Sequence, residues 1–174
     1  RQLAVNRTNI STNFKNIQES IDKAIELDPE NAPAYATAAA FKAFRTQQPL
    51  DKVLIKKALN IGGDNSETLS ALISAYQWGN NHPKVIETTK KYFELAPLGP
   101  TRYKLTMLGS YIALSNNEEA KALANSMIGS DEFSDFWGKL FIIFLEEKSG
   151  NNEKANTLHA DFIAKNKTTN QDII

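Results

Sequence analysis

The chain has 174 residues, no cysteine, and 20 basic side chains balanced by 20 acidic ones. The lack of cysteine excludes disulfides, thiolate zinc sites and a cysteine nucleophile. The charge balance holds in each half of the chain, so a basic nucleic-acid-binding surface is not expected. Hydrophobic residues make up 41% of the chain, which is ordinary for a folded globular protein.

Apolar residues recur at helical spacing along the chain, and no segment alternates as a half-buried strand would. The pattern predicts helices near 12–27, 33–45, 51–60, 66–78, 83–95, 100–114, 117–128, 133–148 and 152–165. Residues 1–9 are expected to add only a short partial helix, and the polar tail 166–174 is expected to fray. The predicted core faces include Ile17, Ile21, Ala24 and Ile25; Leu69, Leu72, Ile73 and Tyr76; and Phe136, Leu140, Phe141, Phe144 and Leu145.

Helix-stopping residues recur every 34 residues, at Pro29, Gly63 and Pro97. Later in the chain, Ala120 and Ala155 lie 35 residues apart, and each follows a turn rich in Ser, Gly and Asn. A fixed period of this size is typical of stacked helix hairpins. The spacing predicts repeats near 12–31, 32–65, 66–99, 100–134 and 135–165 within one domain. We expect this domain to be part of a longer protein, because the sequence opens on Arg1 and not on Met.

The period and the residue types together resemble the tetratricopeptide repeat (TPR). The residues that carry the likeness are Tyr35, Ala39, Ile55 and Ala58; Leu69, Leu72, Tyr76, Val85 and Pro97; Leu108, Gly109, Tyr111 and Ala120; and Ala155. The resemblance implies an all-α, right-handed α-solenoid of TPR-like helix hairpins that binds other proteins. The sequence departs from the pattern at Asp51, where a small residue is usual, and at Tyr92, where alanine is usual.

A narrower likeness lies in residues 17–40, which read IQESIDKAIELDPENAPAYATAAA. This stretch is similar to the TPR tails behind OmpR-type winged-helix transcription activators, the CadC-like and HilA-like proteins, and also to tails behind class III adenylate cyclases. The resemblance implies a protein–protein interaction and regulatory part of a larger bacterial protein, with a transcriptional regulator as the leading host. A self-association module and a small-ligand sensor domain of a signalling protein are the alternatives. The implied location is the cytoplasm, or the periplasm if a transmembrane helix lies upstream.

Two aromatic residues, Phe44 and Trp78, fall where the family's concave groove lies. Small residues flank them at the other groove positions, namely Ala36, Ala40, Ser70 and Ser74. This arrangement predicts a shallow partner-binding groove with aromatic anchors, although neighbouring repeats could equally cover the two rings. TPR domains that bind chaperones use lysine and asparagine at these groove positions to hold a peptide's terminal carboxylate. The small residues here cannot form such a clamp, so the resemblance does not imply a co-chaperone of that type.

No group of residues predicts catalysis, a cofactor or a metal site. The two histidines, His82 and His159, lie in different repeats, and the pairs Glu118–Glu119, Asp131–Glu132 and Glu146–Glu147 are interpreted as solvated helix faces. The longest apolar run, residues 140–145, is far too short to cross a bilayer. We therefore expect a non-enzymatic chain whose partner is another protein, a peptide or a second copy of the chain. Direct nucleic-acid binding and membrane contact are not expected of this segment.

Overall fold

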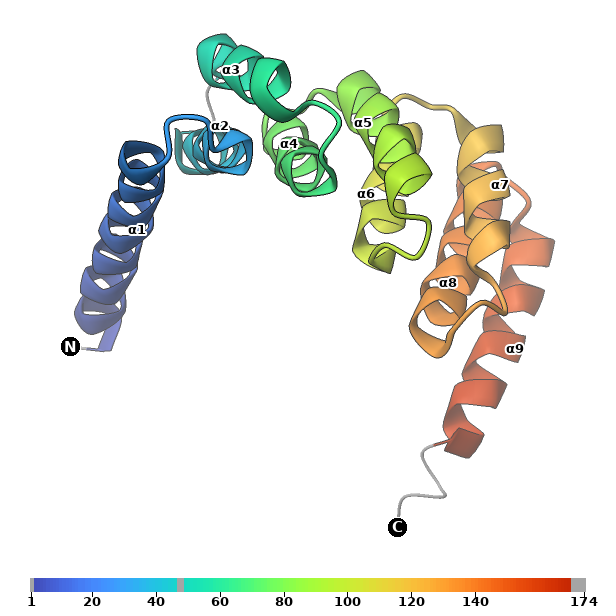
Figure 1. The fold of residues 1–174 in the computed structure, drawn as a ribbon. Helices are drawn as coiled ribbons and strands as arrows, with labels where there is room; N and C mark the ends of the chain where they lie inside the picture. The colour runs from blue at the N-terminus through green and yellow to red at the C-terminus, as the bar shows by residue number, and fades with distance from the viewer. Residues whose placement is uncertain (1, 47–48, 170–174) are drawn as a thin grey trace. The chain divides into compact units, whose positions relative to one another are not determined.

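The computed structural model describes the backbone of residues 2–46 and 49–169 and the side chains of 12–46 and 49–164 (Figure 1). The regular elements in this part of the chain are all α-helices, which confirms the all-α class. They are α1 (Gln2–Leu27), α2 (Ala32–Thr46), α3 (Lys52–Gly62), α4 (Ser66–Trp78), α5 (His82–Leu95), α6 (Thr101–Ala113), α7 (Asn117–Met127), α8 (Glu132–Lys148) and α9 (Asn152–Thr169).

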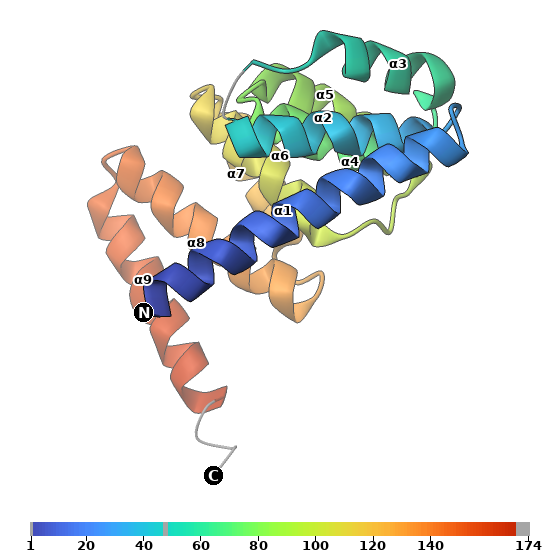
Figure 2. The ribbon, with the colours of Figure 1, turned by 90° about the vertical axis from the view of Figure 1, so that its left-hand side faces the viewer.

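The chain divides into two compact units, Arg1–Gly99 and Pro100–Ile174. The division falls at the boundary that the sequence predicts between the third and fourth repeats. In the first unit, α2 packs against α1, α3 and α4, and α4 also packs against α5 (Figures 1 and 2). In the second unit, α7 packs against α6 and α8, and α8 packs against α9.

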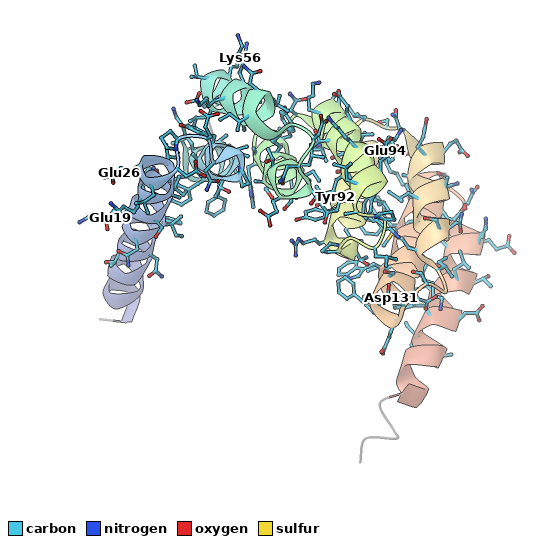
Figure 3. The ribbon with its side chains drawn as sticks, viewed as in Figure 1. Glu19, Glu26, Lys56, Tyr92, Glu94 and Asp131 are labelled. Atoms are coloured by element: carbon cyan, nitrogen blue, oxygen red, sulfur yellow. The ribbon has the colours of Figure 1, made fainter. Side chains whose placement is uncertain are left out.

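The first helix is longer than expected. The sequence predicts a helix over 12–27 with a short partial helix before it, whereas α1 runs without interruption from Gln2 to Leu27. Ile21 is buried against α2, but Ile17, which the helical pattern assigns to the core, is 43% exposed. Glu19 and Glu26 lie on the side of α1 away from α2 (Figure 3). At the other end of the chain, α9 continues to Thr169, beyond the predicted end at 165, and the rest of the tail lies outside the described residues.

Alanine dominates the centre of the first unit. The side chains of Ala36, Ala39 and Ala43 on α2 are buried, and such short side chains let neighbouring helices approach closely. A glycine serves the same purpose at the end of α3, because a Cβ atom on Gly62 would lie 2.7 Å from the Cβ atom of Ala32. The Gly62–Gly63 pair therefore ends a helix, as expected, and also permits close packing.

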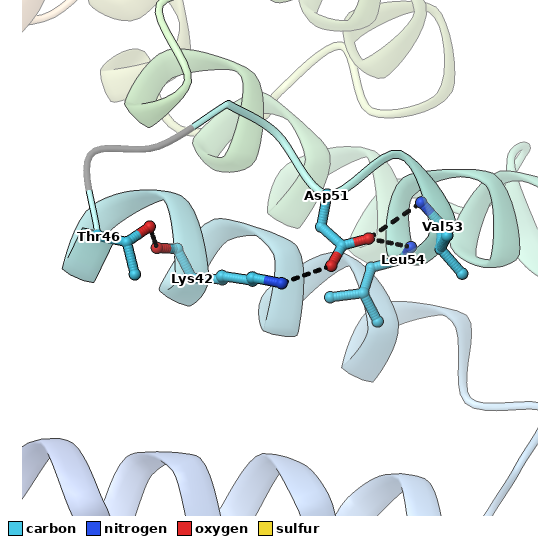
Figure 4. Close-up of polar contacts among 5 residues, drawn as sticks. All are labelled: Lys42, Thr46, Asp51, Val53 and Leu54. Carbon is cyan, nitrogen blue, oxygen red and sulfur yellow. Dashed lines mark hydrogen bonds and ion pairs between the residues drawn. The ribbon is translucent and has the colours of Figure 1, made fainter.

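Asp51 begins α3 and explains one departure from the repeat pattern. One of its carboxylate oxygens accepts hydrogen bonds from the backbone N–H groups of Val53 and Leu54, and the other accepts one from Lys42 Nζ at 2.8 Å (Figure 4). The bond from Lys42, followed by that from Leu54, holds the pKa of Asp51 below its ordinary value. An alanine at this position could not cap the helix, and no small residue could form the ion pair with Lys42 that ties α3 to α2.

Three turns repeat the same backbone geometry. Asn80, Ser115 and Gly150, which are 35 residues apart, all have positive φ angles, of 52°, 60° and 79°. In each turn the N–H of the next residue donates to a carbonyl oxygen in the last turn of the preceding helix: Asn81 to Tyr76, Asn116 to Tyr111 and Asn151 to Glu146, at 2.8, 2.9 and 3.0 Å. This is a left-handed helix end of the Schellman type. The hairpins α4–α5, α6–α7 and α8–α9 are therefore equivalent in register.

Candidate functional site

The two aromatic residues predicted to line a groove lie in contact with each other. Phe44 lies in the last turn of α2, and Trp78 is the last residue of α4. Their ring centroids are 4.7 Å apart, with an angle of 66° between the ring planes. The rings remain accessible, because Phe44 is 41% and Trp78 is 49% exposed. Neighbouring helices thus cover about half of each ring, which leaves an aromatic surface at one end of the two helices.

The small residues predicted to flank this pair differ in accessibility. Ala36 is completely buried, so it packs between helices and offers no surface. Ala40, Ser70 and Ser74 are half-buried, and the hydroxyl of Ser74 donates a hydrogen bond to the carbonyl oxygen of Ser70 at 3.4 Å. The surface beside the aromatic pair is therefore formed by small residues on both α2 and α4.

A third ring on α1 extends the aromatic surface. Phe14 packs edge-on against Phe44, at 6.0 Å between centroids, and against Phe41, at 5.9 Å. A hollow of about 370 Å³ lies next to it, lined by Phe14, Lys15, Gln18, Glu19 and Arg45. Phe14 was not among the residues predicted to line a groove. Its position one helical turn before Ile17 and two before Ile21 was the available signal.

The second unit also exposes aromatic side chains, on α8, and two of them were predicted to lie in the core. Phe136 and Phe144 were predicted to be buried, but they are 39% and 44% exposed, and Phe133 is 55% exposed. The buried face of α8 contains Leu145, as predicted, together with Gly138 and Ile142 in place of the two phenylalanines. Since α8 is apolar on more than one face, its periodicity could not show which face packs inward.

The rings on α8 form a continuous chain. Trp137 contacts Phe133, Phe136 and Phe141, with centroid separations of 6.2, 5.6 and 6.1 Å, and Phe136 contacts Phe162 of α9 at 5.2 Å. Beside them a cleft of about 740 Å³ lies along α8 and α9. It is lined by Trp137, Leu140, Phe141, Ile143, Phe144, Glu147, Asn152, Ala155, Asn156 and His159.

Glu146 contradicts the interpretation of Glu146–Glu147 as a solvated pair. Its side chain is only 5% exposed and lies where Tyr76 and Tyr111 lie in the two preceding hairpins. Asn151 Nδ2 donates to Oε2 at 2.7 Å, and Lys154 and Lys121 approach Oε1 at 2.9 and 3.3 Å. The bonds from Asn151 and Lys154 lower the pKa of Glu146 to about 2, against the opposing effect of burial. The carboxylate therefore joins α7, α8 and α9 as an ion.

The remaining candidates form no chemical site. His82 begins α5, in the first unit, and His159 lies on α9, in the second. The described side chains include no group of three or more His, Cys, Asp or Glu residues placed to hold a metal ion. None of the helices in the described part of the chain has both the length and the apolar character needed to span a bilayer.

Comparison with known proteins gives no relative. No family model matches the chain, and neither a curated protein nor a solved structure does.

Proposed function

We propose that this chain is a TPR-like domain, a right-handed α-solenoid of helix hairpins, that binds a protein or peptide. The equivalent turns at Asn80, Ser115 and Gly150 support the repeat, because they place three hairpins in one register. The 35-residue step is close to the period of that family. The packing of α4 against α2, on which Ala36, Ala39 and Ala43 are buried, also agrees with stacked hairpins.

The observation that carries the binding function is the half-exposed contact between Phe44 and Trp78. Large aromatic side chains at the surface of a rigid scaffold are common anchors in protein interfaces. The small side chains of Ala40, Ser70 and Ser74 leave room beside them for an extended segment or a helix. In the host that we propose, a bacterial transcriptional regulator, such a groove would receive a regulatory protein segment in the cytoplasm, or in the periplasm if the groove lies beyond an upstream membrane helix.

A displayed library of random peptides tests this function. We expect the chain to enrich a family of peptides whose affinity falls at least about tenfold in Trp78→Ala. The matched control is Val53→Ala, which removes apolar surface from a residue of the same unit that is 78% exposed. If the selected peptides bind Trp78→Ala as tightly as they bind the parent chain, the Phe44–Trp78 groove is not their binding site.

Self-association is the second candidate function, because α8 exposes aromatic surface at the last hairpin of the described chain. Sedimentation equilibrium at increasing protein concentration measures it directly. A stable dimer that persists in Trp78→Ala would favour this alternative over peptide binding in the groove. The sensor alternative requires a small ligand, and thermal-shift screening of small metabolites addresses it.

A further inference from the structure

The cleft between α8 and α9 lies where the next helix of a hairpin array would pack. Residues of α2 and α8 correspond at an offset of 104 residues. The caps of α2 and α4, Asn31 and Asn65, are 34 residues apart. The equivalent turns that follow α4, α6 and α8 add two further steps of 35 residues. Leu140, Ile143 and Glu147 of the cleft are thus the counterparts of Ala36, Ala39 and Ala43. Those three alanines are buried.

In the first unit, the helix on this alanine face is α4. Helix α1 packs on the side of α2 that holds Ala38 and Phe41, and residue 43 lies about 200° around the helix from residue 41. The alanines therefore face away from α1, and α2 packs extensively against α4. A helix of the next hairpin covers this face.

The second unit shows the same relationship one hairpin before the cleft. Ala124 on α7 is fully buried in a cluster with Ile142 of α8, the next helix. The counterpart of Ala124 on α9, 35 residues later, is His159, which is exposed and lines the cleft. Within the described chain, no following helix covers α9 as α8 covers α7.

The cleft has the shape and composition of a seat for one more helix. Its residues on α8 run from Trp137 to Glu147, a rise of about 15 Å, or roughly three turns of a packed helix. Aromatic and aliphatic side chains form the α8 side, and Asn152, Asn156 and His159 form a polar edge on α9. An apolar floor with a polar rim is typical of a groove that accepts an amphipathic helix.

One charged group restricts the chemistry of the occupant. Among the residues that line the cleft, Glu147 is the one carboxylate, and no lysine or arginine lines it. A helix seated over Leu140 and Ile143 would remove water from this carboxylate, which is costly unless the helix brings an opposite charge. We infer that the α8–α9 cleft binds an amphipathic helix of a partner protein that carries a lysine or arginine beside its apolar stripe. The inference concerns a different unit from the Phe44–Trp78 groove and does not depend on it.

Two model peptides of about 18 residues, long enough to form helices in solution, test the proposal. One is an amphipathic helix of leucine and lysine, and the other is its leucine and glutamate counterpart. Fluorescence anisotropy of the labelled peptides against the full chain is expected to show 1:1 binding of the lysine peptide. We expect the glutamate peptide to bind at least about tenfold more weakly.

Matched variants locate the binding site. Phe144→Ala and Glu147→Gln are each expected to weaken binding of the lysine peptide at least about fivefold. Their controls are Phe133→Ala, a more exposed ring on the same helix outside the cleft lining, and Glu153→Gln, which removes the same charge from an exposed position on α9. The controls should change the affinity less than about twofold. Circular dichroism confirms that each variant is folded.

Three results would overturn the proposal. Equal affinity for the two peptides would show that Glu147 does not favour a positively charged helix. Unchanged affinity of the lysine peptide for Phe144→Ala would show that the peptide binds outside the cleft. If the chain alone forms a dimer that Phe144→Ala dissolves, the occupant is a second copy and not a partner helix.

Discussion

Lys154 donates a hydrogen bond from α9 to the buried carboxylate of Glu146 on α8, with 2.9 Å between Nζ and Oε1. Lys121 reaches the same oxygen from α7, at 3.3 Å. One carboxylate therefore joins three consecutive helices at a position that is a tyrosine in the two preceding hairpins. The stability of the second unit should depend on whether this group is ionised.

Replacing Glu146 with glutamine tests this dependence. We expect a loss of about 2 kcal/mol of unfolding free energy at pH 7, because the two lysines lose their partner while remaining partly solvated. The folded pKa of about 2 lies below the ordinary 4.5, so the stabilisation is complete above the ordinary value and disappears as the pH falls towards 2. Urea unfolding at several pH values should therefore show the two chains converging at low pH. Glu147→Gln, an exposed neighbour, is the control, and a difference that is the same at pH 3 and pH 7 would contradict this account.

Two glycines of the second unit should respond to alanine in opposite directions. A Cβ atom at Gly138 would lie 2.7 Å from the carbonyl oxygen of Ala124, so Gly138→Ala should force α7 and α8 apart and cost about 2 kcal/mol or more. At Gly109 on α6 nothing lies within 4 Å of the added atom. Gly109→Ala should stabilise the chain by about 0.5–1 kcal/mol through helix propensity. Urea midpoints measure both, and a stabilised Gly138→Ala would show that the helices are less closely packed.

Substitutions at two left-handed turn residues, Ser115 and Gly150, should also change the stability in opposite directions. Ser115 has a φ of 60°, where a side chain is unfavourable, so Ser115→Gly should stabilise the chain by about 1 kcal/mol. Gly150, with a φ of 79°, is the counterpart, and Gly150→Ala should cost about the same amount. Thermal unfolding followed by circular dichroism compares the two. Destabilisation by Ser115→Gly would contradict the equivalence of the turns.

The contact between Phe44 and Trp78 can be measured without a partner. A double-mutant cycle with Phe44→Ala and Trp78→Ala should give a coupling free energy of about 0.5–1.5 kcal/mol, as edge-to-face rings do. Each single variant should cost less than the roughly 3–5 kcal/mol of a fully buried ring, because about half of each side chain is exposed. A larger loss from Trp78→Ala would make the residue part of the core.

The helix boundaries could be predicted because local residues determine them. Asp51 and Asn65 cap α3 and α4 through their own side chains, and the turns after α4, α6 and α8 contain Gly, Asn and Ser. The predicted helix 66–78 begins and ends where α4 does, and most other boundaries agree within one or two residues. The proximity of Phe44 and Trp78 was likewise consistent with the repeat spacing, since the two residues lie 34 residues apart, in the last turns of α2 and α4.

The face that each helix buries was decided by tertiary packing where the pattern was ambiguous. Helix α8 has apolar residues almost all the way round, so its periodicity allowed either Phe136 and Phe144 or Gly138 and Ile142 to face the core. Gly138 packs inward because only a glycine tolerates the carbonyl oxygen of Ala124 so close. Glu146 is buried for a related reason. Its sequence neighbours indicate a solvated carboxylate, and the lysine and amide groups that stabilise its charge come from α7, α9 and the turn between α8 and α9, which only the folded chain brings together.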